Sequence, residues 1–215
     1  MKKIMLILFL FLSVFTCYIT YKLTINKTPY YLSIGDKVAD NPYLLNNPQI
    51  IYNNYFINKD YRIIDLVNTI KYNEEIEVDN KLISIHQLLK KSDILILSIG
   101  NNDIYSKINT DTKEIYTYLN KMINDTEYIL DEINRYDYQR VYVLGYYNIT
   151  LKNNDLFTYI NFKLKKITEA RNYTFIDLNN LIKNNPKYLI KENNYLLNES
   201  GYRIIYNILK ENNNL

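Results

Sequence analysis

The sequence predicts an α/β protein, a three-layer α/β/α sandwich whose central parallel sheet has about five strands. Short apolar runs alternate with longer segments of helical periodicity along most of the chain. That alternation is typical of a parallel sheet whose strands are joined by crossover helices. At 215 residues, 47% hydrophobic and 23% charged, the chain is long enough for one globular domain with a full core.

Five short apolar runs are the expected strands. They cover residues 30–35, 50–57, 93–100, 140–147 and 173–178. In open α/β sheets, ligands bind at the carboxyl ends of the strands. We therefore look for chemistry in the residues that directly follow these runs.

Three longer segments have the apolar spacing of helices. The clearest is 111–135, where Asp111 and Glu114 form the start signal of a helix and apolar residues follow on one side. Residues 153–170 and 199–211 show the same spacing. These segments are expected to be the crossover and terminal helices that cover the sheet.

An insertion on the main sheet is expected between the second and third strands. Residues 76–85, IEVDNKLISI, predict a small hairpin with Asp79 and Asn80 in its turn. The single histidine of the chain, His86, follows directly, on the helix before the third strand. No patterned serine turn lies near it, so we expect a surface or half-buried helix residue.

An apolar run over residues 4–21 follows two lysines. Its 18 residues give roughly 27 Å of helix, at the short end of what spans a bilayer. The residues before Cys17 are Phe and Thr, which fits neither a signal-peptide cut nor a lipoprotein site. We expect residues 1–27 to be a signal anchor with a short linker and 28–215 to be one domain on the extracytoplasmic side. Secretion after signal cleavage is the alternative.

Composition argues against several classes of site. The net charge is +3 and the lysines are scattered, so no nucleic acid partner is expected. Cys17, the single cysteine, lies inside the apolar run and leaves no disulfide or CxxC site in the domain. The acidic residues show no metal-ligand spacing and the glycines no nucleotide loop. We expect neither a metal nor a cofactor.

Three segments resemble sequence blocks of the SGNH/GDSL hydrolases. SIGDKVAD (33–40) is similar to the first block, in which Gly-Asp-Ser closes the first strand. LSIGNNDI (97–104) is similar to the Gly-x-Asn-Asp block, and NNYLLNESGY (193–202) to the last block, Asp-x-x-His-x-Asn-x-x-Gly-Tyr. A weaker match to the second block lies at 60–70. The resemblance covers about residues 29–212 and implies the flavodoxin-like fold of these hydrolases.

The resemblance also implies a serine esterase, in which Ser attacks, His takes the proton and Asp orients the His. The oxyanion is held there by the Ser and Gly amides and an Asn side chain. Position by position, this chain has Lys37 for the serine, Asp60 for the glycine, Asn193 for the aspartate and Leu196 for the histidine. Among the five positions, Asn102 alone keeps the family residue.

The same family geometry places Lys37 beside Asp60, because the amides of both positions point at one oxyanion. We therefore expect an ion pair between the Lys37 ammonium and the Asp60 carboxylate across the former pocket. The retained glycines and aspartates are expected to make tight turns and to cap backbone amides, and Asn198 with Gly201 to organise the start of the last helix. The residues expected to line the former pocket are Gly35, Asp36, Gly100, Asn102 and Asp103.

Ordinary ester hydrolysis is not expected from such a site, because losing a triad member costs several orders of magnitude in rate. Ser33, Ser98 and Ser106 have no base that the sequence supplies. We expect a membrane-anchored, non-catalytic protein of a bacterial cell envelope that binds an envelope glycan, an acylated ligand or a protein partner. The alternative is an active esterase, lipase or acyl-transfer enzyme that acts on envelope lipids or acylated glycans with unconventional residues.

Overall fold

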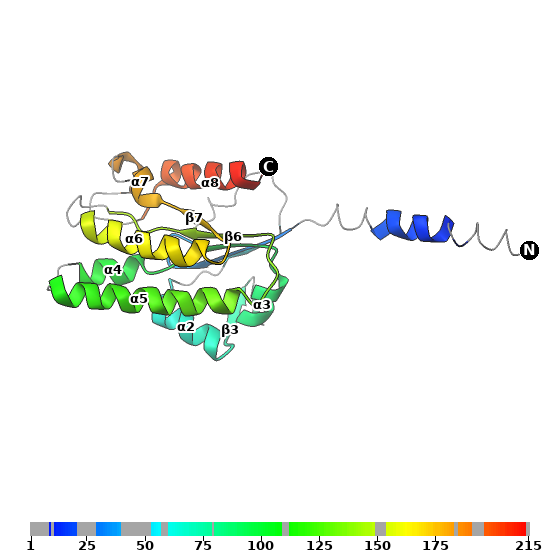
Figure 1. The fold of residues 1–215 in the computed structure, drawn as a ribbon, viewed down its shortest axis with the longest axis horizontal. Coiled ribbons are helices and arrows are strands. Elements are labelled where there is room, and N and C mark those ends of the chain that lie inside the picture. Colours follow the sequence, from blue (N-terminus) through cyan, green and yellow to red (C-terminus); the bar gives the residue numbers. More distant parts are fainter. Residues whose placement is uncertain are drawn as a thin grey trace, which may run out of the picture.

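A computed structural model shows the central sheet with helices on both of its faces (Figure 1). This arrangement confirms the predicted α/β fold. The structure describes residues 9, 11–20, 29–39, 53–56, 60–78, 80–108, 112–148, 154–182, 185–190 and 196–213.

The central sheet has five strands in the order β2-β1-β5-β6-β7, and all four pairings are parallel. From β1 the chain passes first to β2 on one side and then to β5 on the other. This reversal is a topological switch point, where ligands bind in open α/β sheets. The strands are β1 (Tyr30–Gly35), β2 (Asn53–Phe56), β5 (Ile94–Ser98), β6 (Arg140–Leu144) and β7 (Thr174–Ile176).

Helices cover both faces of the sheet. Figure 1 shows α8 on one side and α2, α3 and α5 on the other. The helices are α2 (Ile63–Lys71), α3 (Ile85–Lys91), α4 (Asn101–Lys107), α5 (Thr112–Ile133), α6 (Asn154–Glu169), α7 (Leu178–Ile182) and α8 (Glu199–Asn213), with a 3-10 turn η2 (Pro186–Tyr188).

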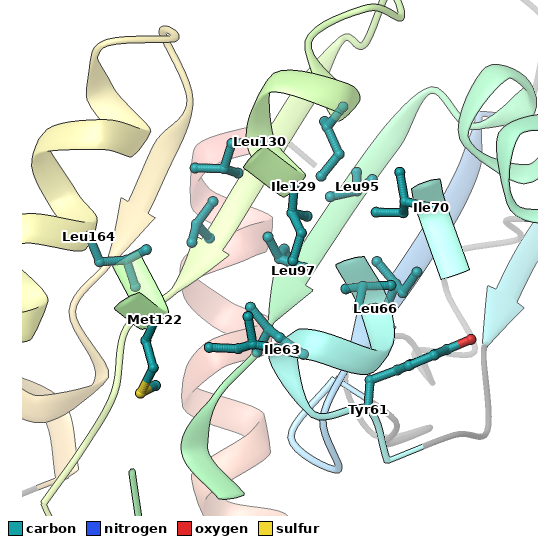
Figure 2. Packing of buried hydrophobic residues seen from close by; sticks show 14 of the residues in the cluster. Tyr61, Ile63, Leu66, Ile70, Leu95, Leu97, Met122, Ile129, Leu130 and Leu164 are labelled. Atoms are coloured by element: carbon teal, nitrogen blue, oxygen red, sulfur yellow. The ribbon is translucent and has the colours of Figure 1, made fainter. Parts of the chain in front are cut away.

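Strand β5 shows why the expected strands are continuous apolar runs. Its side chains alternate between two buried clusters, so that Leu95 and Leu97 pack with α2 and α5, while Ile94 and Ile96 pack with α7 and α8. Figure 2 shows the first of these clusters around Leu97. A strand that is buried on both faces has no polar side to reveal its period.

The predicted long helix and the predicted hairpin are both present in the structure. The segment 111–135 is helix α5, and the hairpin is β3 (Glu75–Val78) paired antiparallel with β4 (Lys81–Ser84). Asn80 lies in its turn with φ of 60°, in the left-handed region that asparagine tolerates. Asp79 lies outside the described residues.

The apolar N-terminal run is described at residues 9 and 11–20, where it is helical and its side chains are exposed. Phe11, for example, is 78% exposed. No helix in these parts of the chain, or elsewhere among the described residues, combines the length and the apolarity needed to cross a bilayer. An anchor over 4–21 stays a prediction.

Candidate functional site

Three of the predicted site residues, Lys37, Asp60 and Asn102, come together at the switch point, where β1 and β5 end side by side. Gly35 ends β1 with φ of 138°, and Gly100 precedes α4 with φ of 99°. Both values lie in the region that favours glycine. The two turns are joined by a hydrogen bond from the Asp36 N–H to the Ser98 carbonyl oxygen, at 2.7 Å.

Asp36 holds these two turns together from inside the protein. Its Oδ1 accepts hydrogen bonds from the Val38 N–H (3.0 Å) and the Ser98 hydroxyl (2.9 Å). Its Oδ2 accepts from both the backbone N–H and the side-chain amide of Asn101, each at 3.0 Å. The expectation that Asp36 caps backbone amides is confirmed.

Burial raises the pKa of Asp36 to about 6, and the hydrogen bonds from Asn101, Ser98 and Val38 oppose that rise. Since the unfolded value is about 3.9, the folded chain binds this proton more tightly. The stability that Asp36 contributes is therefore fully present below about pH 4 and is lost as the pH rises through about 6. The loss is on the order of 3 kcal/mol.

The carboxyl carbon of Asp36, followed by ¹³C NMR across this range, is expected to titrate with a midpoint near 6. An Asp36→Asn variant assigns the resonance. A midpoint close to that of a free aspartate would contradict the effect of burial.

Asp103 joins the same region to α2 and α5. Its Oδ2 accepts from the Ile63 N–H at 3.1 Å, at the start of α2, and its Oδ1 accepts from the Tyr118 hydroxyl of α5 at 3.1 Å. The Arg62 guanidinium lies 3.5 Å from this carboxylate. Asp103 was expected to cap backbone amides in its own turn, but the amide that it caps belongs to the start of α2, so that its side chain holds α4 against its neighbours.

Asp60 connects the turn after β1 to the start of α4. Its Oδ1 accepts a hydrogen bond from the Lys37 backbone N–H at 3.1 Å and another from the Asn102 side-chain amide. The segment is held in place by the Tyr61 N–H, which donates to the Gly35 carbonyl oxygen at 3.0 Å. These two donors are the ones to which the family resemblance assigns the oxyanion. A carboxylate oxygen of the protein itself accepts from both of these donors.

The expected ion pair between Lys37 and Asp60 is corrected by this geometry. The two residues are neighbours, but the ion pairs of the described residues do not include the Lys37 ammonium. The Lys37 side chain is exposed, and an exposed pair gains only about 0–1 kcal/mol over a hydrated ammonium. The Asp60 carboxylate instead accepts a hydrogen bond from the Lys37 backbone N–H, which is fixed in the turn.

The hydroxyls of Ser33, Ser98 and Ser106 are all used in hydrogen bonds within the fold, and none of the three is bonded to a histidine. The sequence supplied no base for Ser98, and the structure shows that its hydroxyl donates to Asp36. Both side chains are fully buried, at 0% exposure, so a substrate cannot reach them. The hydroxyls of Ser33 and Ser106 donate to backbone carbonyls at 2.6 and 2.8 Å.

His86 has a structural role on α3. Its Nε2 lies 2.9 Å from the Ile70 carbonyl oxygen and must donate to it. Its Nδ1 then accepts from the Tyr136 hydroxyl. The ring is half-buried with both nitrogens in use, which confirms the expectation of a half-buried helix residue.

In the last sequence block, residues 193–202, Asn198 makes the hydrogen bonds that organise the start of α8. Asn198 Oδ1 accepts from the Gly201 N–H at 3.1 Å, and its Nδ2 donates to two backbone carbonyls, which confirms its role at the start of α8. Leu196 is half-buried, and its carbonyl accepts from the Ile190 N–H at 3.0 Å. Asn193 lies outside the described residues.

Sequence reasoning missed the part played by Asn101 and Ser98, which hold the Asp36 carboxylate. The signal was available, because a polar residue at the end of a fully apolar strand needs a buried partner. Within the described ranges, no three His, Cys, Asp or Glu side chains come together as metal ligands do.

No protein-family model and no curated protein matches the sequence. Solved structures do match it. A catalytic mutant of Axe2, an acetylxylan esterase from Geobacillus stearothermophilus, is 16% identical with a TM-score of 0.62, over 85% of this chain and 93% of that one. The lipase Lip_vut3 from a goat rumen metagenome is 15% identical with a TM-score of 0.62, over 86% and 97%. The chain has the fold of these hydrolases, as the SGNH/GDSL resemblance implied.

Proposed function

We propose that this chain is a non-catalytic protein with the SGNH/GDSL hydrolase fold, tethered to the outer face of a bacterial membrane by residues 4–21. Its role is to bind or to scaffold at the cell envelope, with an envelope glycan, an acylated molecule or a protein as its partner. The observation that carries the proposal is the position of Asp60, whose carboxylate accepts from both the Lys37 N–H and the Asn102 amide.

Ester hydrolysis places negative charge on the former carbonyl oxygen, and that charge needs donors at about 2.7–3.1 Å. Here the donors are bound to a carboxylate of the protein. A substrate oxygen would have to displace this carboxylate and then develop its own negative charge beside it. Since the loss of one such donor already costs about 10²–10³ in kcat, the occupation of two is expected to stop the reaction.

The residues at the positions of the nucleophile and the base also argue against catalysis. The position of the attacking hydroxyl holds the exposed Lys37, and the position of the proton acceptor holds the aliphatic Leu196. The catalytic mutants of Axe2 change a serine, an aspartate and a histidine, the last two three residues apart. Asn193 and Leu196 have that same spacing without either functional group.

The membrane tether is supported by the exposed apolar side chains at the N-terminus. Phe9, Phe11 and Leu12 are 74%, 78% and 62% exposed, and such an apolar surface favours contact with lipid. The hydroxyl of Thr16 donates to the Leu12 carbonyl oxygen at 2.9 Å, within its own helix. Polar groups that are satisfied in this way suit an apolar environment.

The test is to incubate the full chain, purified in detergent micelles, with p-nitrophenyl acetate and p-nitrophenyl butyrate, and with a fluorophosphonate probe. We expect hydrolysis at the rate of empty micelles and no labelled serine. A serine esterase in the same micelles is the positive control. Turnover that disappears with one point substitution, or covalent labelling of Ser33, Ser98 or Ser106, would overturn the proposal in favour of an enzyme.

A further inference from the structure

A hollow lies beside the edge strand β7. It has a volume of about 210 Å³ and is formed by α6, the carboxyl end of β7 and the start of α7. Sites that enclose drug-sized ligands measure about 300–1,000 Å³. This hollow therefore suits a ligand the size of one ring, and the described residues that line it do not include Lys37, Asp60, Asn102 or Leu196.

The floor of the hollow is polar and fixed. Asn161 is 6% exposed, and its side-chain amide both accepts from the Tyr146 N–H (2.8 Å) and donates to the Tyr146 carbonyl oxygen (2.7 Å). Asn179 is 5% exposed, and its Oδ1 accepts from the Asn148 N–H at 2.9 Å. Among the described residues, no hydrogen bond uses the Nδ2 of Asn179. This buried side chain offers two N–H donors to whatever enters the hollow.

The hydrogen-bond acceptors of the hollow, the oxygens of the Asp177 carboxylate, are also fixed in position. The Asp177 carboxylate accepts from the Asn180 backbone N–H at 3.1 Å and from the Asn180 side-chain amide at 2.7 Å, so its orientation is set before any ligand arrives. A carboxylate retains further acceptor positions beyond two such bonds. Lys165 on α6 also lines the hollow, and its ammonium lies 3.7 Å from the Glu169 carboxylate on the same helix. The lining residues therefore include one cationic and one anionic side chain, and the site is polar.

The wall toward solvent is aromatic. Phe162 on α6 lines the hollow and is 65% exposed, and Phe175 of β7 lines it from inside. The face of an aromatic ring carries partial negative charge and attracts polarised C–H groups. A ligand that fits presents C–H bonds on one face and both hydroxyl donors and carbonyl or hydroxyl acceptors at its edge.

We infer that this hollow binds one uncharged saccharide ring, stacked on Phe162 and hydrogen-bonded at its edge to Asn179 and Asp177. An N-acetylated sugar fits best, because its amide carbonyl is an acceptor for the Nδ2 of Asn179, which donates to none of the described residues. The inference does not depend on the absence of catalysis at Asp60. A failure of the non-catalytic proposal leaves it intact, and its own failure leaves that proposal intact.

The test is titration calorimetry on the full chain in micelles with N-acetylglucosamine and with its β-1,4-linked tetramer. We expect saturable binding of at least one of them, and a tighter tetramer identifies a polymer as the source of the ring. Phe162→Ala is expected to weaken binding at least about tenfold, the loss of a stacking contact together with its buried area. Asn179→Asp keeps the acceptor for Asn148 and removes the donors, and is expected to weaken binding by a similar factor.

The matched control is Tyr72→Ala, an aromatic side chain of the same 65% exposure at the end of α2. It is expected to leave binding unchanged. Phe162→Ala alters an exposed side chain, so its melting temperature should equal that of the wild type and the binding result can be interpreted. No heat with either saccharide, or binding that Phe162→Ala and Tyr72→Ala leave equally strong, would overturn the inference.

Discussion

Replacing Gly35 with alanine is expected to destabilise the domain by at least about 4 kcal/mol, a large part of the roughly 5–15 kcal/mol by which a typical domain is stable. A Cβ atom at this position would lie 1.6 Å from the Ser98 carbonyl oxygen, which is backbone on the neighbouring strand. The φ of 138° is also one that alanine rarely adopts. Relief of the clash would require β1 to separate from β5 at the centre of the sheet.

The measurement is urea denaturation of the full chain in micelles, followed by circular dichroism. Lys37→Ala is the matched control in the same turn, because it removes only an exposed side chain and keeps the N–H that binds Asp60. That control is expected to change the unfolding free energy by less than about 0.5 kcal/mol. A Gly35→Ala protein with wild-type stability would mean that β1 and β5 do not approach as described.

We expect that ester hydrolysis can be restored to this chain only if Asp60 is replaced together with the catalytic positions. The variant carries Lys37→Ser, Asn193→Asp and Leu196→His together with Asp60→Gly. It supplies a hydroxyl, a base and an orienting carboxylate, and it frees the Asn102 amide and the backbone N–H of residue 37 for the oxyanion. We expect hydrolysis of p-nitrophenyl acetate at least about 100-fold above background, a small part of what a complete triad provides.

The decisive comparison is with the variant that keeps Asp60 and carries the other three changes. It is expected to be slower by about 10²–10³, the effect of losing oxyanion donors. Both are assayed in the same micelles, with circular dichroism to show that they are folded. Equal and measurable rates for the two would mean that Asp60 does not obstruct the oxyanion position.

Much of the scaffold could be predicted because its determinants are local in the sequence. The apolar runs that became β1 and β5 are bounded by Gly35 and Gly100, and each glycine marks a turn with positive φ. The strand expected over 50–57 is described at Asn53–Phe56, where it pairs in parallel with β1. The order of the strands, with β2 and β5 on opposite sides of β1, depends on contacts distant in the sequence.

The site itself was predictable only in part. Spacing and resemblance placed Lys37, Asp60 and Asn102 together, and the structure does so. The sequence could not show which atoms of Lys37 and Asp60 would meet. That choice depends on where the turn points its N–H and on whether the ammonium reaches water, and both are set by contacts distant in the sequence.

The central claim is that the Asp60 carboxylate lies on the oxyanion donors, and NMR of the amide groups tests it most directly. Spectra of the ¹⁵N-labelled chain are compared between the wild type, Asp60→Ala and the control Asp65→Ala, which removes an exposed carboxylate from α2. A hydrogen bond to a carboxylate moves a donor proton downfield. We predict that Asp60→Ala shifts the Lys37 backbone and Asn102 side-chain amide protons upfield, while Asp65→Ala leaves both in place. If both resonances stay unchanged in Asp60→Ala, the claim is wrong.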